Sequence, residues 1–469
     1  MSLLKGVKVL DLTRVLAGPW CTMMLGDLGA SVIKLERPGI GDDTRSWGPP
    51  FLKSKTKRGD DDDMSTYFAS LNRNKKSLAL NLKHPHGLHI TKKLCTEWAD
   101  VVIENFKPGT MEQLGLDYNS VLQRANPALI YCSITGFGPT GPLSQRPGYD
   151  VIISAMYGLM SITGSEESGP VKTGVALTDV LTGTLANSAI LAALHQRNAT
   201  GKGQRVDASL MESQLAGLVN IAGSSLNTTK FKTKRWGTAH ASIVPYQAFV
   251  CSCGEALVIG AGNDVQYQHL CKVLLLGTAN NDDSVDESRL LLQEDQFATN
   301  SKRVQHRHVL IPLLERLFRQ RTRDEWLQIT EEYSASNNGG AETALFPHGP
   351  IRSVPEAFAC EQALHRDMVM EVEHPELVEP IRLPGVPVKY NSNIQASSLF
   401  DHEDISIPAG NKSDLLRMIP PPMLGEHTQE ILHDVLDMSY DEIRELEIEG
   451  AISCWKRATE KEFDENMQR

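Results

Sequence analysis

Hydrophobic and polar positions at the start of the chain predict a strand, a helix and a second strand. The segments Val7–Leu12 and Ala30–Leu35 are rich in β-branched and aliphatic residues, and short apolar runs of this kind are typical of buried strands. Between them, Trp20–Leu28 has the composition of a helix. This order predicts a βαβ unit, in which a helix connects two parallel strands.

The same alternation continues further along the chain. A helix is predicted at 86–98, and strands are predicted at Val101–Ile103 and Leu129–Ile134. Alternating strands and helices indicate an α/β protein with a doubly wound, mainly parallel sheet. Ligands of such sheets bind beyond the carboxyl ends of the strands.

Two later helices have recognisable ends. An apolar-rich helix is predicted from Asp179 to Gln196, and the glycine-containing segment 198–203 would end it. Ser209 and Glu212 have the spacing of a capping box, which predicts that another helix begins there.

Changes in composition predict how the chain divides into domains. Residues 1–227 carry the alternating pattern and are predicted to form a large domain. Strand-like positions at 243–264 follow a polar, basic stretch, so 228–345 is predicted to be a second, smaller domain. Residues 346–469 are predicted to return to the large domain and to end in a helical segment.

The composition places the chain among folded globular proteins and excludes several partners. The 469 residues are 41% hydrophobic and 22% charged, with a net charge of −11, so no basic footprint for nucleic acid is present. No apolar run approaches the roughly 20 residues that span a bilayer, which predicts no membrane partner. The chain enters its first strand at once and shows no targeting signal, so it is expected to be cytoplasmic unless a presequence has been removed.

Cysteines, histidines and acidic residues give no sign of a metal site. The eight cysteines are scattered, and Cys251 and Cys253 have the wrong spacing for a C-x-x-C unit, which predicts buried thiols in a reducing compartment. His84 and His86 have nothing near them in the sequence to complete a ligand set. The charged segment 53–63 lacks the alternation of a calcium loop and is predicted to be a solvated loop.

The glycine motifs do not favour a dinucleotide. Gly136–Gly141 matches G-x-G-x-x-G, but Pro139 and Pro142 disfavour the helix that must follow, so a turn is predicted. Glu36 follows Gly18 at roughly the spacing of a ribose-binding acid, yet the loop at Gly18 lacks the other glycines. No G-x-S-x-G elbow or Walker loop occurs in the chain.

Asp179 is the strongest candidate for chemistry, because it lies where a strand-like segment meets a helix. On the pattern alone, an ordinary helix cap is the favoured interpretation, since aspartate is a preferred N-cap residue. The alternative is a nucleophile, because helix-start amides could stabilise an oxyanion beside it.

Read together, the ordered motifs of the chain resemble those of the class III coenzyme A (CoA) transferases, also called the CaiB/BaiF or formyl-CoA transferase family. The motifs are V-L-D-L-T-R-V-L-A-G-P, L-G-D-L-G-A-S-V-I-K-L-E-R-P, L-N-R-N-K-K-S, V-I-E-N-F-K-P-G, S-I-T-G-F-G, G-Y-D, G-V-A-L-T-D, G-K-G-Q-R-V-D and P-P-M-L-G-E-H-T. The resemblance implies a Rossmann-like large domain built from both chain ends, a smaller α+β domain, and two interlocked subunits forming a homodimer.

The resemblance also implies a mechanism. In that family the aspartate matching Asp179 attacks an acyl-CoA thioester to give a mixed anhydride, which CoA converts to an aspartyl-CoA thioester. The acceptor carboxylate then reverses these steps. CoA would therefore be a substrate, and no tightly bound cofactor or metal is implied.

Positions that match the family's CoA contacts can be carried over by motif. Val15, Leu16 and Phe106 could equally be core residues, and Arg37 and Lys75 could be surface charges. Gly260, Ala261 and Gly262 resemble the glycine loop that closes over the reacting aspartate, although this loop is less glycine-rich here. The implied CoA contacts are Val15, Leu16, Ala17, Arg37, Leu71, Lys75, Asn105, Phe106, Ile134, Thr135, Gly136 and Phe137.

Two departures from the family affect CoA placement. Formyl-CoA transferase has a lysine where Thr135 stands and an arginine where Gln113 aligns, so two cationic contacts are missing here. The related α-methylacyl-CoA racemases use a histidine in G-H-D, whereas this chain has Gly148-Tyr149-Asp150. A tyrosine phenol, with an ordinary pKa of about 10, is a poor base at neutral pH, so transfer is favoured over racemisation. A non-catalytic acyl-CoA-binding protein is the third alternative.

Within the family, the segments G-D-D-T-R-S-W-G-P-P-F and K-R-W-G-T-A-H-A-S-I-V-P-Y-Q-A-F resemble members that move CoA from succinyl-CoA to glutarate or hydroxymethylglutarate in mitochondria. The resemblance therefore implies acyl-CoA and small dicarboxylic acids as partners and a mitochondrial location. Arg14, Arg45 or His240 could bind the distal carboxylate of the acid, and each could equally form a structural ion pair.

Overall fold

The computed structural model describes residues 3–55, 63–230, 232–278, 282–337, 345–390 and 418–455, which form two compact units. The larger unit combines Met1–Leu159, Thr173–Thr228 and Glu361–Arg469. The smaller unit combines Met160–Lys172 with Thr229–Cys360. The predicted boundary at 345 is therefore wrong, because strand β11 (His348–Pro350) and helix α16 (Val354–Ala359) belong to the smaller unit. Most of the predicted solvated loop at 53–63 lies outside the described residues.

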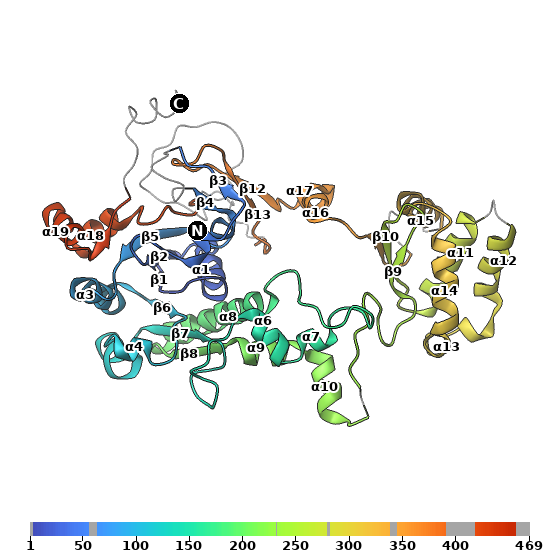
Figure 1. Cartoon of the computed structure of the whole chain (residues 1–469), viewed down its shortest axis with the longest axis horizontal. Helices are drawn as coiled ribbons and strands as arrows, with labels where there is room; N and C mark the ends of the chain where they lie inside the picture. The colour runs from blue at the N-terminus through green and yellow to red at the C-terminus, as the bar shows by residue number, and fades with distance from the viewer. Residues whose placement is uncertain are drawn as a thin grey trace. The chain divides into compact units, whose positions relative to one another are not determined.

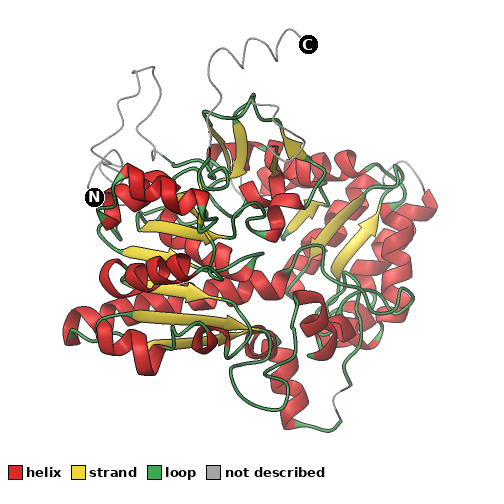
Figure 2. Ribbon diagram, turned by 60° about the vertical axis from the view of Figure 1, so that its left-hand side comes forward, coloured by secondary structure: helices red, strands yellow, loops and turns green. Residues whose placement is uncertain are grey.

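The larger unit contains a seven-stranded sheet in the order β14-β5-β2-β1-β6-β7-β8. Six strands are parallel, and the short β14 pairs antiparallel with β5 at one edge. Numbered along the chain, the parallel strands follow the order 3-2-1-4-5-6, which is the doubly wound order of a Rossmann-like sheet. Figure 2 shows strands of this sheet side by side in yellow. The seven strands are β1 (Lys8–Asp11), β2 (Ser31–Glu36), β5 (Lys75–Leu80), β6 (Val101–Glu104), β7 (Ile130–Thr135), β8 (Arg205–Ser209) and β14 (Ile452–Ser453).

This order confirms the predicted doubly wound sheet and locates its ligand crevice. The chain turns from one half of the sheet to the other between β1 and β6, whose neighbouring carboxyl ends create a crevice. The strands predicted near 7, 30, 101 and 129 all occur, whereas β5 and β8 are not among the predicted strands.

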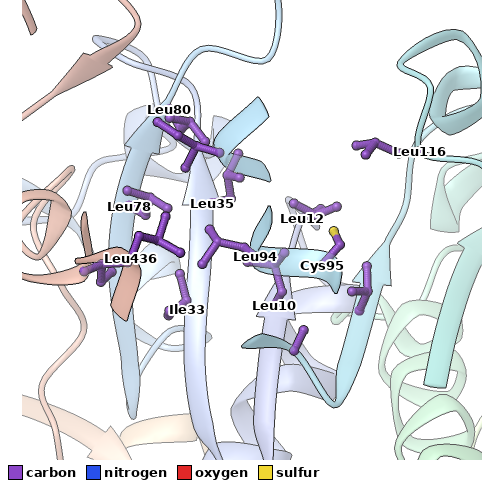
Figure 3. Close-up of a cluster of buried hydrophobic side chains, with 14 of the residues drawn as sticks. Leu10, Leu12, Ile33, Leu35, Leu78, Leu80, Leu94, Cys95, Leu116 and Leu436 are labelled. Atoms are coloured by element: carbon purple, nitrogen blue, oxygen red, sulfur yellow. The ribbon is translucent and has the colours of Figure 1, made fainter. Parts of the chain in front are cut away.

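Successive side chains of the sheet strands point into two separate cores. Val9 and Ile103 face helices α1 (Ala17–Asp27) and α8 (Leu177–Thr200). Leu10 and Val102 face the opposite core, which Figure 3 shows in part. This second core is covered by helices α3 (Pro85–Lys93), α18 (Thr428–Leu436) and α19 (Tyr440–Ile448).

The C-terminal helices complete the core of the N-terminal sheet. Leu436 of α18 belongs to the same buried cluster as Ile33 and Leu78 of the sheet (Figure 3). The large unit is therefore built from both ends of the chain, as the resemblance implied.

Helix α8 is longer than predicted and approaches α1 very closely. A Cβ atom on Gly183 would lie 2.4 Å from the carbonyl oxygen of Ala17, so only glycine fits at this position. The helix ends at Gly201, whose positive φ of 70° suits a glycine after a helix end. By length and hydropathy, α8 is apolar enough to cross a membrane, which the sequence analysis did not predict. Its packing against α1 and the sheet is that of a core helix.

The other elements of the larger unit surround the carboxyl edge of the sheet or lie beside its helices (Figure 1). Ser209 caps α9 by accepting the N–H of Glu212 at 3.2 Å, as the spacing predicted. These elements are β3 (Phe51–Leu52), β4 (Met64–Ser65), α2 (Thr66–Ala69), α4 (Thr110–Gln113), α5 (Gln123–Ala125), α6 (Asp150–Met156), α9 (Leu210–Gly217), α10 (Val219–Asn227), α17 (Glu361–His365), β12 (Val369–Val372) and β13 (Ile381–Pro384). Helix α7 (Leu159–Ile162) begins at the last residue of one segment of this unit, and its other residues belong to the smaller unit.

The smaller unit is an α+β structure with its own core. The predicted strand-like stretch 243–264 forms two antiparallel strands, and Cys253 lies in the exposed turn between them, so the prediction of buried thiols is wrong for this cysteine. Phe318 and Trp326 pack edge to face in the core at 5.4 Å between ring centroids. The elements are β9 (Tyr246–Val250), β10 (Ala256–Gly260), β11, α11 (Asp264–Gly277), α12 (Asp282–Gln293), α13 (Asn300–Gln305), α14 (Arg307–Phe318), α15 (Arg323–Asn337) and α16.

Candidate active site

The loop after β1 is held in an unusual conformation at the sheet crevice. Val15 has a φ of 73°, in the left-handed region that β-branched residues rarely adopt. Its backbone N–H donates to both oxygens of Asp42, at 3.1 and 3.2 Å. The Asn105 side chain accepts from the backbone N–H of Arg14 and donates to its carbonyl oxygen. Asn105 and Asp42 thus fix the loop from both neighbouring strands, which brings Val15, Leu16 and Ala17 next to Asn105.

A buried network of charged side chains lies next to the β1–α1 loop and holds it in place. Asp11 accepts hydrogen bonds from Thr13 and Thr22, and it pairs with the Lys75 ammonium at 3.1 Å. Burial opposes the charge of Asp11, but Lys75, Lys34 and the two hydroxyl donors outweigh it and lower its pKa to about 2. Asp11 therefore remains ionised at neutral pH.

The Lys75 ammonium lies inside the fold. Lys75 is fully buried and also donates to Asn72 and to the carbonyl oxygen of Pro19. Burial lowers its pKa to about 8, against the attraction of Asp11. The three hydrogen bonds of the Lys75 ammonium are thus used within the fold, and its contact with CoA stays a prediction.

Asp179 is the third residue of α8 and does not cap it. The N-cap is Ala176, which has no capping side chain. Asp150, at the start of α6, supplies the cap instead, since its Oδ2 accepts from the backbone N–H groups of Thr178 at 2.8 Å and Asp179 at 3.4 Å. The helix-cap interpretation of Asp179 is therefore wrong, and the amides once considered for an oxyanion are already occupied.

Asp179 is a carboxyl group with an altered acidity. Burial, followed by the negative charge of Asp150, raises its pKa to about 7. Burial also raises the pKa of the Tyr67 phenol, and Asp179 and Asp150 raise it further. Two carboxyl groups and one phenol therefore lie within electrostatic reach of one another, and a perturbed carboxyl group of this kind is typical of a functional site.

Helix packing places Asp179 beside the β1–α1 loop. Gly183, one turn after Asp179, lies against the backbone of Ala17. The indole N–H of Trp20 in α1 donates to the hydroxyl of Thr184 at 3.1 Å. The structure therefore brings the candidate nucleophile together with the loop that the resemblance assigned to CoA.

The segment after β7 leads to Asp150, which contacts the first turn of α8 beside Asp179. Ile134, Thr135 and Phe137 are buried, and a Cβ atom on Gly136 would lie 2.7 Å from the Cα atom of Gly148. Gly148 stands two residues before Asp150. No described helix begins between β7 and Asp150, so the predicted turn at Gly136–Gly141 is confirmed.

The remaining predicted CoA contacts differ in how accessible they are. Arg37 follows β2 and is exposed, whereas Leu71 is buried. Phe106 packs against the core beneath the sheet, and its N–H donates to Glu104 at 2.8 Å. Arg37 is the charged residue among these three, and its exposed guanidinium is accessible to a phosphate of CoA.

The three predicted carboxylate partners also have different environments. Arg45 forms a bidentate ion pair with Glu36, both contacts at 2.7 Å, and stacks over Phe68. Its guanidinium is thus held within the fold, as the structural ion-pair alternative has it, and its contact with substrate stays a prediction. Arg14 is exposed and pairs with the exposed Asp43 at 3.0 Å. His240 lies in the smaller unit, where its Nδ1 accepts the N–H of Ser242. Arg14 and His240 stay predictions.

The glycine loop is an ordered turn between β10 and α11 of the smaller unit. The backbone N–H groups of its three residues are all bonded within that unit. Gly260 donates to the carbonyl oxygen of Pro347, Ala261 to that of Pro245, and Gly262 to the side chain of Gln266. Its role in closing over Asp179 stays a prediction.

Sequence reasoning missed three residues of this site. Asp150 was noticed only as part of the G-Y-D motif, and Asp42 and Tyr67 were not singled out. Their roles depend on contacts with Asp179, Thr178 and the β1–α1 loop. A spacing signal within one segment could not have identified such contacts.

Comparisons with known proteins agree with this geometry. Residues 4–398 match the family described as CoA-transferase family III. The chain is 45% identical to succinyl-CoA:glutarate CoA-transferase of Mus musculus over 96% of this chain and 91% of that protein. It is 37% identical to succinate–glutarate CoA-transferase of Agrobacterium fabrum, over 92% and 95% of the two chains.

A solved structure shows the same fold. The crystal structure of a CaiB/BaiF family protein from Brucella suis is 36% identical and covers 92% of this chain and 99% of its own, with a TM-score of 0.74. The sheet order, the motifs around Asp179 and these relatives lead to one conclusion: the chain belongs to CoA-transferase family III and is a CoA-transferase.

Proposed function

We propose that this enzyme transfers CoA from succinyl-CoA to glutarate or hydroxymethylglutarate, with Asp179 as the nucleophile. The observation that supports this role is the raised pKa of Asp179, close to 7, beside the β1–α1 loop. A carboxylate of higher pKa is a better nucleophile than an ordinary aspartate, and at neutral pH a large fraction of it is still ionised. The relatives in mouse and Agrobacterium are succinyl-CoA:glutarate and succinate–glutarate CoA-transferases, which supports this donor and this acceptor.

The proposed chemistry needs no group other than CoA and the two acids. An Asp179 oxygen attacks the thioester carbon of succinyl-CoA, the C–S bond breaks, and CoA leaves as a thiolate. The thiolate attacks the Asp179 acyl carbon, which releases succinate and forms an aspartyl-CoA thioester. Glutarate then displaces CoA, and CoA attacks the glutaryl carbon to release glutaryl-CoA and free Asp179.

The loop residues would hold CoA at the sheet crevice. We infer that the β1–α1 loop lies along the ligand, fixed by Asp42 and Asn105, while the exposed Arg37 contacts a phosphate. Arg14 remains the candidate partner for a distal carboxylate in the larger unit, because its side chain is 59% exposed. The role of Asp150 is to fix the first turn of α8 and to keep the Asp179 pKa high.

We expect the purified protein, given succinyl-CoA and glutarate, to form glutaryl-CoA and succinate in equal amounts. Mass spectrometry of the acyl-CoA pool would measure this directly. In parallel, Arg14→Ala should raise the KM for glutarate more than it lowers kcat. An ion pair between Arg14 and the distal carboxylate of glutarate would contribute to substrate binding and not to the chemical step.

A panel of acids provides the control for the acceptor. Hydroxymethylglutarate should be accepted and acetate should not, because acetate lacks the second carboxylate. Equal rates with acetate and glutarate would refute a dicarboxylate site. Absence of any new acyl-CoA across the panel, although succinyl-CoA binds, would instead favour a non-catalytic acyl-CoA-binding protein.

We also propose that the enzyme is a homodimer. Apolar side chains are exposed on helices α6, α8 and α10, which are linked through α9 in the larger unit. Apolar surface of this extent on a folded chain is typical of an interaction site. The exposed residues are Val151, Ile152, Met156, Leu177, Leu185, Val219 and Leu226.

Light scattering is therefore expected to give a mass twice the 51.7 kDa of one chain. Leu226 is 85% exposed on α10, and Leu226→Asp should weaken the dimer because it would bury a charge in an apolar contact. Ile448→Asp, at a 77% exposed position on α19, is the matched control and should leave the mass unchanged. A monomeric wild-type protein at micromolar concentration would contradict the proposal.

A further inference from the structure

Two helix ends from opposite parts of the chain meet on the surface of the larger unit. His84 is the N-cap of α3, and His86 lies in the first turn of that helix. Glu449 follows directly after α19 and is its C-cap. Nothing near the two histidines in the sequence completes a ligand set, but the fold brings a carboxylate from the far end of the chain to them.

Backbone contacts fix this meeting point. Strand β14, which follows α19, pairs with β5, which precedes α3. Between these elements, the backbone N–H of Asn81 donates to the carbonyl oxygen of Ala451 at 2.8 Å, and its side chain donates to that of Gly450 at 3.3 Å. The three side chains are therefore placed by ordered main chain on both sides.

The three side chains gather their ligand atoms within a small volume. One ligand atom from each residue lies within 4.8 Å of the others. The Nδ1 of His86 lies 3.2 Å from an oxygen of Glu449, and the two imidazole rings are nearly perpendicular with centroids 5.4 Å apart. Ligands about 2.1 Å from one zinc ion lie on the order of 3.5 Å apart. Small rotations of the half-buried His84 and of the exposed His86 and Glu449 side chains would suffice to reach this spacing.

We propose that His84, His86 and Glu449 form a surface site for a divalent transition-metal ion of the zinc class. Two imidazole nitrogens and one carboxylate oxygen are ligands that Zn²⁺ prefers, whereas Mg²⁺ and Ca²⁺ prefer oxygen ligands alone. Water would complete the coordination, since three protein ligands leave a position open. The bound ion would join α3 to α19 and so fasten the C-terminal helices to the sheet.

The side chains of His84, His86 and Glu449 already make contacts without a metal ion, and a bound ion must compete with these contacts. His84 Nδ1 accepts the backbone N–H of His86 at 3.3 Å, which is long for a hydrogen bond. The His86–Glu449 contact is between side chains that are 58% and 48% exposed, so it stabilises the fold little by itself. An ion that binds all three side chains therefore replaces at least the weak His86–Glu449 contact.

Isothermal titration of the metal-free full-length protein with ZnCl₂ tests this site. We expect one Zn²⁺ per chain at this site and a thermal unfolding midpoint that rises with zinc concentration, because an ion bound to the native state stabilises it. The variants His86→Ala and Glu449→Gln should each weaken this binding by more than about tenfold and remove the thermal shift. MgCl₂ should give neither effect.

Two further variants separate the site from other zinc ligands. His195→Ala removes an exposed histidine of α8 and should bind zinc as the wild type does. Cys253→Ser removes the exposed thiol and should also leave the thermal shift intact. The proposal is overturned if His86→Ala and Glu449→Gln bind zinc as tightly as the wild type, or if the wild type binds none. Neither outcome bears on CoA transfer, because the site lies outside the groups around Asp179.

Discussion

Replacing Asp179 by alanine is expected to lower the rate of CoA transfer by about 10³-fold or more, since loss of a covalent nucleophile removes the reaction path itself. The affinity for succinyl-CoA should change little, because the β1–α1 loop and Arg37 do not depend on the Asp179 side chain for their positions. Rates of glutaryl-CoA formation and calorimetric binding of succinyl-CoA would measure the two effects separately. Transfer at near-normal rates by Asp179→Ala would refute the nucleophile.

Asp179→Asn is the matched variant, because it keeps the shape of the side chain and removes its charge. The native pKa of about 7 lies above the ordinary value of 3.8, so between these two pH values the folded protein binds more protons than the unfolded chain. The contribution of Asp179 to stability therefore falls as pH rises from about 4 to 7. We expect Asp179→Asn to be inactive yet more stable than the wild type at pH 7.5. A lower unfolding midpoint would contradict this electrostatic account.

Asp150 tests the source of the raised pKa. In the wild type, kcat/KM should fall below pH 7, because the nucleophile must be ionised to attack. Asp150→Asn removes the neighbouring negative charge but keeps an oxygen that can cap α8, so the same limb should move to lower pH. An unmoved limb would mean that burial alone, which is the larger of the two causes, sets the acidity of Asp179.

Local patterns in the sequence predicted the parts of this protein that depend on neighbouring residues. The β1–α1–β2 unit, the turn at Gly136–Gly141 and the Ser209 cap are all decided within a few positions. The motif resemblance supplied the rest of the prediction for Asp179, since pattern alone favoured a helix cap. Both kinds of prediction concern what one segment of chain does.

The contacts that local patterns do not predict are pairs that form only when the sheet is assembled. Lys75 forms one such pair. Its partner, Asp11, lies on β1, and nothing in the sequence shows that their side chains meet inside the core. Arg45 forms another, with Glu36 at the end of β2. Asp150 and Glu449 acquire their roles in the same way, through contacts between distant segments.

Lys75→Met is expected to destabilise the fold by about 3–5 kcal/mol, because it leaves the fully buried Asp11 without its ion-pair partner. Asp11 also orients Thr13, whose carbonyl oxygen accepts from Lys34 at 2.8 Å, and Lys34 pairs with the Asp42 that holds Val15. The loss should therefore weaken CoA binding as well. Urea unfolding followed by circular dichroism would measure the stability.

Lys76→Met supplies the matched control on the next residue of β5. Lys76 pairs with Glu430 at the surface, where both side chains are more than 40% exposed, and such pairs are worth about 0–1 kcal/mol. The double variant Asp11→Asn/Lys75→Met should be more stable than Lys75→Met alone, because the uncompensated charge is gone. A Lys75→Met protein no less stable than Lys76→Met would mean that the buried pair does not support the loop.

The dependence of stability on pH in the acid range gives an independent measure of the Asp11–Lys75 pair. The pKa of Asp11 is lowered to about 2 in the native state, so the unfolded chain binds more protons between about pH 4 and pH 2. The stabilisation from Asp11 is therefore present above pH 4 and is lost as pH falls through this window. Without Lys75 the native pKa of Asp11 should rise, since burial then opposes ionisation with less compensation. The Lys75→Met protein is consequently expected to lose less stability between pH 4 and pH 2, although it starts from a lower value at pH 7.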